Sequence, residues 1–323
     1  MGSFLEKPKT EKATERAEGN GLLAGMSDMQ GWRVDMEDAH TVMPSIAGWD
    51  GFSFFGVYDG HGGSLVSKHV AEHILDEIRS HGGAEAGSTD ELSAAWVKAH
   101  MSLDAKMREL PSVKGGEDHS GSTSIQAIVS PTHILVANCG DSRAVLSKVG
   151  SPMVWGSEDH KPNLEPEQKR IEAAGGSVMN RRVNGDLAVS RAFGDFLYKH
   201  REDLPPERQQ VSVEPEISVF ERAPAHDEFL ILCCDGIWDV MSNEDVVGFV
   251  RTKHDQGCID LGQIAEDLLD RCLTGGSRDN MSALIVRFPA AKMPASSVVE
   301  AYLAREEERK KAEAAAAAGG ASA

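Results

Sequence analysis

The amino-acid sequence predicts an α+β fold in which two antiparallel β-sheets pack as a central sandwich, with helices on both sides. Strand-like and helix-like segments come in groups along the chain, not in strict alternation, which is typical of antiparallel sheets. The links at 130–132 and 140–142 join successive strand-like runs through three residues each, and links this short require antiparallel pairing. With 323 residues, 41% of them hydrophobic, the chain can build a substantial core.

Six short apolar runs, bounded by turn-forming residues, are expected to be buried strands. They are residues 52–58, 124–129, 133–138, 144–147, 229–234 and 283–288. Five segments with apolar residues at helical spacing are expected to be helices, at residues 64–79, 90–110, 166–174, 243–254 and 261–273. Asn243 is expected to cap the fourth of these helices, with Asp245 in its first turn.

The chain divides into three parts by composition. Residues 1–20 are polar and charged and are expected to form an N-terminal arm. Residues 21–290 have a continuous globular pattern and are expected to be the catalytic domain, with an irregular surface excursion at 150–215. Residues 291–323 are expected to form a C-terminal helix followed by an alanine- and glycine-rich tail.

The charge and the cysteines limit the function classes and the compartment. The net charge of −18 argues against nucleic acid or an anionic membrane as the main partner. The five cysteines form no C-x-x-C pair. This favours a protein with reduced cysteines that is located in the cytoplasm, or in the nucleus as well. The first ten residues lack the apolar region of a secretory signal, and the apolar run at 229–234 is too short to span a bilayer.

Three carboxylates stand at the ends of apolar strand-like runs. Asp59 follows the run at 52–58, Asp235 follows the run at 229–234, and Asp279 precedes the run at 283–288. Two carboxylates about 5 Å apart repel by roughly 3 kcal/mol at an effective dielectric constant of about 20, so a cluster needs a cation. Oxygen ligands favour Mg²⁺ or Mn²⁺ over zinc. Asp-Gly is also a common turn, and convergence in space is not visible in a sequence.

Arg33, Glu37 and Asp38 form a second group. A guanidinium group suits bidentate capture of a phosphoryl group, although Arg33 could equally form a surface salt bridge. Glu37 and Asp38 are adjacent, so a regular strand would point them to opposite faces. If both reach a metal site, a bulge, a strand end or a bridging water is needed. His61 lies two residues after Asp59 and could be a ligand, a structural donor or a general acid.

Eight motifs in this chain carry a resemblance to a known family. In order they are GWRVDMEDAH (31–40), VYDGHGG (57–63), SGST (120–123), NCGDSRA (138–144), DHKP (159–162), NGDLAVSRAFGD (184–195), CDGIWDV (234–240) and GSRDNMS (276–282). With these motifs the chain closely resembles the metal-dependent Ser/Thr protein phosphatases of type 2C. The resemblance runs from about residue 20 to 289, and the order of so many motifs makes it specific.

The resemblance implies a two-metal site at one edge of a β-sandwich flanked by helices. The ions would be Mg²⁺ or Mn²⁺, two per site, with a weaker third ion. In members of the family the residue matching Asp59 bridges both ions, the carbonyl group matching Gly60 binds one ion, and the acids matching Asp235 and Asp279 bind the other. The acids matching Glu37 and Asp38 hold metal-bound waters. Those matching Asp141 and Asp239 are linked to the weaker third ion.

The same resemblance implies the reaction. A water that bridges the two ions would attack the phosphorus of phosphoserine or phosphothreonine in a protein substrate. Arg33 would bind the phosphate group, and His61 would act as general acid on the leaving oxygen. Residues 162–200 resemble the flap that lies beside the active site in this family. The enzyme is expected to be a monomer.

Two other function classes remain compatible with the residues alone. One is a phosphoprotein-binding scaffold without turnover, and the other is a protein in which a cation is purely structural. A P-loop nucleotidase or a protein kinase is excluded, because the chain has neither G-x-x-x-x-G-K-[ST] nor H-R-D.

The N-terminal sequence MGSFLEKPKTEK also resembles animal members of the family, which implies a myristoyl group on Gly2. The general pattern for this modification has Ser or Thr at position 6, where this chain has Glu6. A single myristoyl chain gives only weak, reversible membrane binding.

Overall fold

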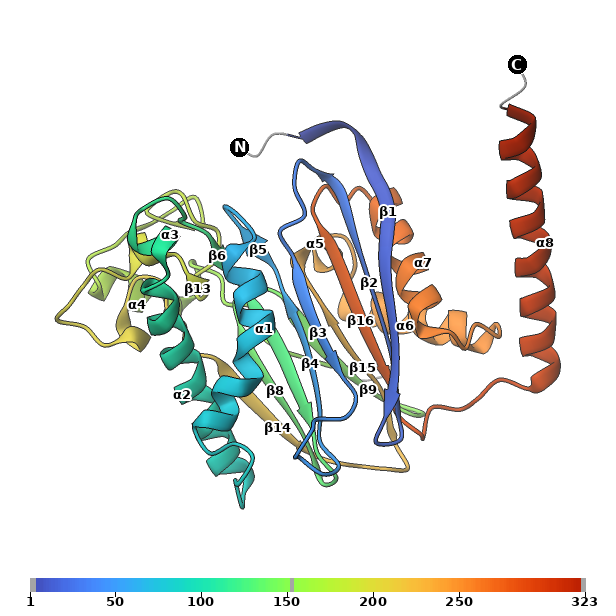
Figure 1. Ribbon diagram of the computed structural model, residues 1–323, viewed down its shortest axis with the longest axis horizontal. Helices are drawn as coiled ribbons and strands as arrows, with labels where there is room; N and C mark the ends of the chain where they lie inside the picture. Colours follow the sequence, from blue (N-terminus) through green and yellow to red (C-terminus); the bar gives the residue numbers. More distant parts are fainter. Residues whose placement is uncertain (1–3, 152–153, 321–323) are drawn as a thin grey trace.

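The computed structural model describes residues 4–151 and 154–320 and contains two antiparallel sheets stacked face to face, with helices on both outer faces (Figure 1). The first sheet has the order β1 (Phe4–Gly19), β2 (Leu22–Arg33), β16 (Met281–Arg287), β15 (Asp227–Cys233), β9 (Arg143–Lys148) and β10 (Val154–Gly156). The second has the order β14 (Glu216–Glu221), β8 (His133–Cys139), β7 (Ser124–Val129), β4 (Ser53–Tyr58) and β3 (Ala39–Met43). The predicted mixture of helices and antiparallel sheets is confirmed.

Two smaller sheets and the helices complete the fold. One small sheet has the order β13 (Phe193–Gly194), β6 (Gly121–Ser122) and β5 (Gly60–His61), and the hairpin of β11 (Val178–Met179) and β12 (Arg182–Val183) forms the other. The helices are α1 (Leu65–Ser80), α2 (Thr89–Arg108), α3 (Pro111–Lys114), α4 (Glu165–Ala173), α5 (Asp235–Trp238), α6 (Asn243–Asp255), α7 (Leu261–Thr274) and α8 (Ser296–Gly320).

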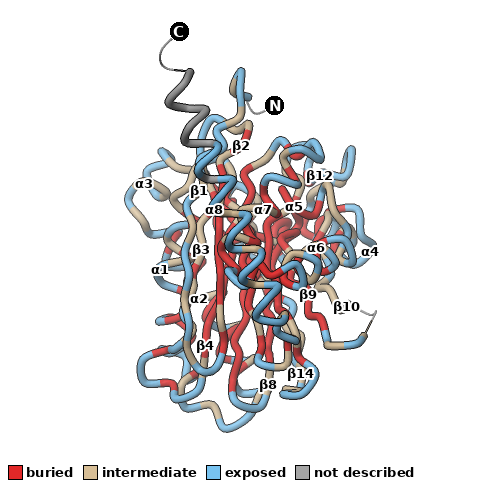
Figure 2. The backbone as a smooth tube through the Cα atoms, turned by 90° about the vertical axis from the view of Figure 1, so that its right-hand side faces the viewer, coloured by how far each residue is buried: buried red, intermediate tan, exposed pale blue. Residues whose placement is uncertain are grey.

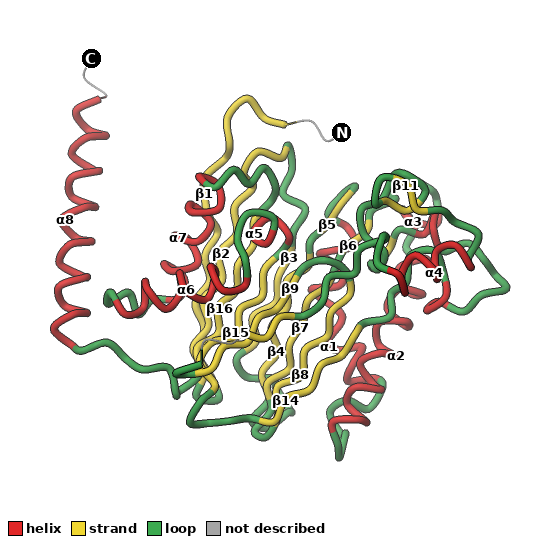
Figure 3. Tube along the Cα trace, turned by 180° about the vertical axis from the view of Figure 1, so that it is seen from behind, coloured by secondary structure: helices red, strands yellow, loops and turns green. Residues whose placement is uncertain are grey.

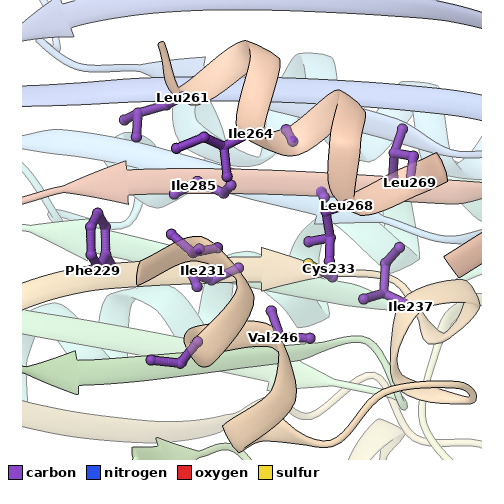
Figure 4. Close-up of a cluster of buried hydrophobic side chains, with 14 of the residues drawn as sticks. Phe229, Ile231, Cys233, Ile237, Val246, Leu261, Ile264, Leu268, Leu269 and Ile285 are labelled. Carbon is purple, nitrogen blue, oxygen red and sulfur yellow. The ribbon is translucent and has the colours of Figure 1, made fainter. Parts of the chain in front are cut away.

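The core has three apolar layers. In β4, Phe55 and Val57 face the space between the two sheets, whereas Phe54 and Tyr58 face α1 and α2. Both faces of β4 are therefore buried, which explains why the run is apolar apart from Ser53. Helices α6 and α7 cover the outer face of the first sheet with a third layer (Figure 4). Figure 2 shows the buried backbone concentrated in the strands, with the exposed residues on the outer helices and loops.

The six predicted strands and the five predicted helices each correspond to an observed element, with ends that differ by a few residues. The predicted cap of α6 is wrong by one residue. Ser242, not Asn243, is the capping residue: its Oγ accepts a hydrogen bond from the Asp245 amide (3.1 Å), and Asp245 Oδ2 accepts one from the Ser242 amide (3.3 Å). This reciprocal pair is a capping box, which satisfies two amides that the helix itself cannot.

The predicted pairing across residues 140–142 is also wrong. Strand β8 lies in the second sheet and β9 in the first, so this short link crosses from one sheet to the other. Gly140 makes the crossing possible, because its φ angle of +119° is one that residues with a side chain rarely adopt. A Cβ atom there would also lie 2.6 Å from Thr123 Cβ. The crossing places Asp141 at the edge where the sheets meet.

The N-terminal segment differs from the expected arm, because Phe4–Gly19 pairs with β2 along the edge of the first sheet. Polar contacts with α7 and with its capping residue hold it there: Arg16 Nε lies 2.7 Å from Oδ1 of the cap, Asp260, and Lys12 Nζ lies 2.8 Å from Asp270 Oδ1. Half of the residues of β1 are charged, so the hydrophobic pattern does not indicate a strand here. Gly2, the predicted lipidation site, lies outside the described residues.

The C-terminal helix α8 continues through the alanine run that was expected to be a tail, and it extends away from the sandwich (Figures 1 and 3). Tyr302 on this helix packs against the core layer beneath α6 and α7. In the described part of the chain, none of the helices combines the length and the apolar character that crossing a membrane would require.

Replacing two of the glycines with alanine is expected to change the stability in opposite directions. A Cβ atom on Gly25 in β2 would lie 2.2 Å from the Gly262 amide nitrogen and 2.3 Å from the Leu261 carbonyl carbon, both in the backbone of α7. We therefore expect Gly25→Ala to destabilise the protein by roughly 1–3 kcal/mol or more. On α6, Gly248 is exposed with no atom within 4 Å of such a Cβ, so Gly248→Ala should stabilise it by up to about 1 kcal/mol.

Urea unfolding of the two variants measures both effects. If Gly25→Ala unfolded at the same urea concentration as the unmodified protein, the close approach of β2 to α7 would be contradicted.

Candidate active site

The fold brings the predicted acids together at one edge of the sandwich. Strands β15 and β16 are antiparallel neighbours, with Cys233 opposite Ala283, so the end of one lies beside the start of the other. Asp235 follows the first strand and Asp279 precedes the second, which places them at the same edge. Asp59 comes from the second sheet, because it follows β4 directly.

A pocket of about 310 Å³ lies at this edge. Seven predicted site residues line it: Arg33, Asp59, Gly60, His61, Asp141, Asp235 and Asp279. The remaining predicted residues, Glu37, Asp38 and Asp239, lie outside this lining. The other walls come from Thr123 and from the predicted flap.

The electrostatics of the pocket fit a cation site. Loss of contact with bulk water, followed by repulsion from Asp235, raises the pKa of Asp59 well above its usual value. The pKa of Asp235 is raised well above its usual value in the same way, by desolvation and then by repulsion from Asp141. Burial raises the pKa of Asp38 to about 7, although the Ser282 hydroxyl donates to it. Bound cations would relieve all three effects.

The donors also have the right chemistry for Mg²⁺ or Mn²⁺, since they are carboxylate and carbonyl oxygens. Asp38 Oδ1 is buried without a hydrogen-bond partner, which leaves an acceptor for a water molecule or an ion. A Cβ atom on Gly60 would lie 2.2 Å from the Glu37 carbonyl oxygen, so glycine is needed for the backbone to lie this deep in the site.

Within residues 4–151 and 154–320, no three His, Cys, Asp or Glu side chains already surround a common point in the way a metal ion requires. Two of the acids contact cationic side chains instead. Arg33 Nη2 lies 2.5 Å from Asp279 Oδ2, and Lys161 Nζ contacts Asp141 Oδ2. A metal ion at this edge would therefore compete with Arg33 and Lys161 for these carboxylates.

Glu37 and Asp38 lie in the irregular segment between β2 and β3, so the alternation of a regular strand does not apply to them. Their side chains diverge. Glu37 Oε1 accepts a hydrogen bond from the Gly63 amide (2.6 Å), and Asp38 Oδ2 accepts one from Ser282 Oγ (2.7 Å). Asn280 fixes this segment, because its Oδ1 accepts from the Glu37 amide at 3.0 Å.

His61 contacts a residue to which the sequence analysis gave no role. Its Nε2 lies 2.8 Å from Asp195 Oδ2, and the Asp195 side chain is only 6% exposed. Burial alone would lower the pKa of His61, but the negative charge and hydrogen bond of Asp195 outweigh it and raise the pKa. The two residues are 134 positions apart in the chain, so sequence spacing gives no sign of the contact.

The predicted third-metal residues lie close to Lys161. Asp141 is buried at the crossing between the sheets, and Asp239 follows α5, one helical turn after Asp235. Burial raises the pKa of Asp239, while Lys161 opposes this change and Asp141 adds to it. Lys161 had no predicted role, and its place in the DHKP motif was the one signal in the sequence that could have pointed to it.

The predicted flap lies beside the pocket, since Arg182, Leu187, Ala188 and Val189 line one side of it. Glu167 on α4 anchors the segment. Its carboxylate lies 2.6 Å from Arg170 Nη1 and 2.7 Å from Arg191 Nη2, and its side chain is 3% exposed. Burial would raise the pKa of Glu167, but the hydrogen bond from Arg191 and the charges of both arginines lower it to about 2.

Glu167→Gln should lower the free energy of unfolding by roughly 3 kcal/mol at pH 7, because two partly buried arginines lose their carboxylate. The native pKa lies below the unfolded value of about 4.3. The stabilisation is therefore fully present above that value and is lost as the pH falls towards about 2. The gap between variant and unmodified protein should stay constant from pH 7 to about 5 and shrink below that.

Glu165→Gln is the matched control, because Glu165 pairs with Lys169 on the exposed side of the same helix. It should change stability by less than about 0.5 kcal/mol. Equal effects of the two substitutions, measured by urea unfolding across pH, would contradict the anchoring role of Glu167.

The stacked sheets and the pocket of carboxylates with an arginine and a histidine are the features expected of a metal-dependent protein phosphatase. Comparison with known proteins agrees. The chain belongs to the protein phosphatase 2C family, because the family model described as Protein phosphatase 2C matches residues 23–281. The enzymes of this family are serine/threonine phosphatases that depend on Mg²⁺ or Mn²⁺.

Named relatives and a solved structure support the assignment. The chain is 46% identical to Protein phosphatase 1A of Mus musculus over 305 residues, which cover 93% of this chain and 79% of that protein. It is also 46% identical to Protein phosphatase 1B of Mus musculus over 310 residues, with the same shares covered. A phosphatase structure from Toxoplasma gondii matches 86% of this chain and 96% of its own, with a TM-score of 0.74 and 27% identity.

Proposed function

We propose that this protein hydrolyses phosphoserine and phosphothreonine in proteins by direct attack of water on phosphorus, with Arg33 binding the phosphate group and His61 acting as general acid. One observation carries the proposal: Arg33 and His61 line the same pocket as Asp59, Asp235 and Asp279. A phosphate group in this pocket would meet a cationic donor and a proton donor next to the acids that hold cations.

Asp59, the Gly60 carbonyl group, Asp235 and Asp279 would hold two Mg²⁺ or Mn²⁺ ions, which lower the pKa of a bound water and offset the charge of the phosphate. Asp141 and Asp239 would hold a weaker third ion. Glu37 and Asp38 would act through water, because both lie outside the pocket lining and already accept hydrogen bonds from the protein.

Arg33 retains donors for a phosphate group while it contacts Asp279. Its Nη2 faces that carboxylate, but its Nε is buried without a hydrogen-bond partner. A buried donor without a partner costs free energy, and a phosphate oxygen would satisfy it. The planar guanidinium group can donate through Nε and a terminal nitrogen at once, which fixes the orientation of the phosphate.

His61 would supply the proton that the leaving serine or threonine oxygen needs. Asp195 favours the charged imidazolium form, in which both ring nitrogens carry a proton. The Nε2 proton is held by Asp195 Oδ2, and the Nδ1 proton is then the one given to the leaving oxygen.

Hydrolysis of a phosphothreonine peptide, measured with Mn²⁺, with Mg²⁺ and with excess chelator, tests the proposal. We expect turnover with either metal and none with the chelator. Binding of the peptide without turnover would indicate a scaffold, and metal-dependent melting without turnover would indicate a structural cation. Either result would overturn the proposed function.

We also propose that the protein acts as a monomer on phosphoproteins of the cytoplasm or nucleus. The five cysteines are free and buried, which suits a reducing compartment. A myristoyl group on Gly2 would add at most weak membrane association.

A further inference from the structure

A buried ion pair lies behind the His61–Asp195 contact and has no role in the proposed mechanism. Lys199 Nζ lies 2.9 Å from Asp104 Oδ2 and 3.0 Å from Oδ1, and the two side chains are 3% and 8% exposed. Neither residue lines the pocket. Burying two charges costs free energy that their attraction often fails to offset, so a pair of this kind is weak evidence for a purely stabilising role.

The ion pair holds the chain on both sides of Asp195. Lys199 Nζ donates to the Ala192 carbonyl oxygen (2.8 Å), and Asp104 Oδ1 accepts a hydrogen bond from the Gly194 amide (2.8 Å). Asp195 itself has a φ angle of +50°, in the left-handed region that residues with a side chain seldom occupy. A backbone held in this region needs surrounding contacts to keep it there.

One face of α2 makes these contacts. His100, Asp104 and Arg108 are four residues apart, so they lie on the same side of the helix. The His100 ring packs on Phe193 with the ring centroids 4.6 Å apart. Arg108 lies 4.6 Å above the ring of Phe196 and donates to the Lys199 carbonyl oxygen at 2.9 Å. Two turns of the helix thus contact the segment 193–199 along its length.

The small sheet sets the distance between His61 and Asp195. Strand β6 lies between β5 and β13, and Gly121 pairs with His61 on one side and with Gly194 on the other. A Cβ atom on Gly121 would lie 2.2 Å from Asp195 Oδ2 and 2.4 Å from His61 Nε2. Glycine at this position of the SGST motif therefore leaves room for the two side chains to meet.

We propose that Asp104 and Lys199 are positioning residues for proton transfer: they fix the segment 192–199 so that Asp195 holds the imidazole of His61 in place for the leaving oxygen. This inference rests on the proposed function, in which His61 protonates that oxygen. The pair acts through the backbone and Asp195 and has no contact with substrate.

The test compares two substrates. A phosphothreonine peptide releases an alkoxide, which needs a proton, whereas p-nitrophenyl phosphate releases a stable anion that leaves without one. The variant Asp104→Leu with Lys199→Met removes both charges at similar volume, so neither charge is left unpaired. We expect kcat for the peptide to fall roughly ten- to a hundredfold with KM unchanged, while kcat for p-nitrophenyl phosphate stays within about twofold.

Two further variants keep the test decisive if the double variant does not fold. Asp104→Asn keeps the size of the side chain and should give a smaller loss with the same selectivity. Gly121→Ala should give the selective loss by a different route, because its methyl group separates Asp195 from His61. Lys106→Met is the matched control. It removes the ion pair between Lys106 on α2 and Glu77 on α1, and kcat for both substrates should stay unchanged.

His61→Gln separates failure of the inference from failure of the proposed function. If His61→Gln lowers kcat equally for both substrates, the general-acid role falls, and the inference falls with it. His61→Gln could instead lower kcat for the peptide only. If the Asp104 variants then lower kcat equally for both substrates, or for neither, the positioning role alone is overturned. The positioning role is supported if kcat for the peptide alone falls in all of these variants except Lys106→Met.

Discussion

Asp59→Asn should lower Mn²⁺-dependent hydrolysis of a phosphothreonine peptide at least about 10²-fold and, in the same protein, raise the melting temperature measured with excess chelator. The two effects have one cause. Desolvation and repulsion from the neighbouring acids raise the pKa of Asp59, so the ionised carboxylate disfavours the metal-free fold and favours a bound cation. Asparagine has nearly the same shape and removes both effects.

The direction of the stability change follows from the linkage between protonation of Asp59 and folding. The native pKa of Asp59 lies above the unfolded value, so the metal-free protein loses stability as the pH rises from the unfolded pKa towards the native one. The amide side chain in Asp59→Asn does not titrate, so the variant avoids this loss. Asp235→Asn should behave in the same way, because its pKa is raised by the same causes.

Melting curves with chelator and with Mn²⁺ measure the second effect. The unmodified protein should be stabilised by Mn²⁺ and Asp59→Asn much less so. Asp76→Asn is the control, since its side chain is 75% exposed on α1, away from the pocket. Near-normal turnover in Asp59→Asn would contradict the assignment of the metal site.

The sequence predicts the central strands well because burial on both faces leaves a strong pattern. Residues 53–58 of β4 are all buried, and the corresponding run is apolar apart from Ser53. β1 and β2 leave no such pattern. Half of the residues of β1 are charged, and the strand is held by pairing with β2 and by an ion pair with Asp270 of α7, while Gly25 of β2 allows a close approach to that helix. The contacts with α7 are long-range and have no local signature, whereas the β1–β2 pairing is a hairpin whose turn, Asn20-Gly21, is a local signal.

The same distinction applies to the candidate site. Asp59, Asp235 and Asp279 could be predicted because each stands at the end of an apolar run. That they meet depends on which strands pair, and the error over residues 140–142 shows that link length alone does not decide this. Asp195 and Lys161 were missed as contacts of His61 and Asp141, because both lie in irregular segments, 134 and 20 positions from their partners, where no regular spacing links them.

Arg33→Met should lower kcat/KM for the phosphopeptide by roughly 10²- to 10³-fold, because the variant loses the donors aimed at the phosphate oxygens. Arg33→Lys keeps the charge but not the planar fork, so we expect it to recover only part of this loss. If Arg33 only formed a surface salt bridge with Asp279, its removal would change kcat/KM little. Inhibition by inorganic phosphate, the reaction product, should weaken in parallel with kcat/KM.

A second measurement on Arg33→Met should change in the opposite direction. Arg33 Nη2 now lies 2.5 Å from Asp279 Oδ2, so its removal frees a carboxylate that is expected to hold a metal ion. We therefore expect Mn²⁺ to bind Arg33→Met at least as tightly as the unmodified protein in a titration without substrate. Arg278→Met is the matched control, because Arg278 is exposed next to Asp279 but does not line the pocket. If phosphate inhibition and Mn²⁺ affinity fell together in Arg33→Met, the arginine would be supporting the metal site and not binding the phosphate group.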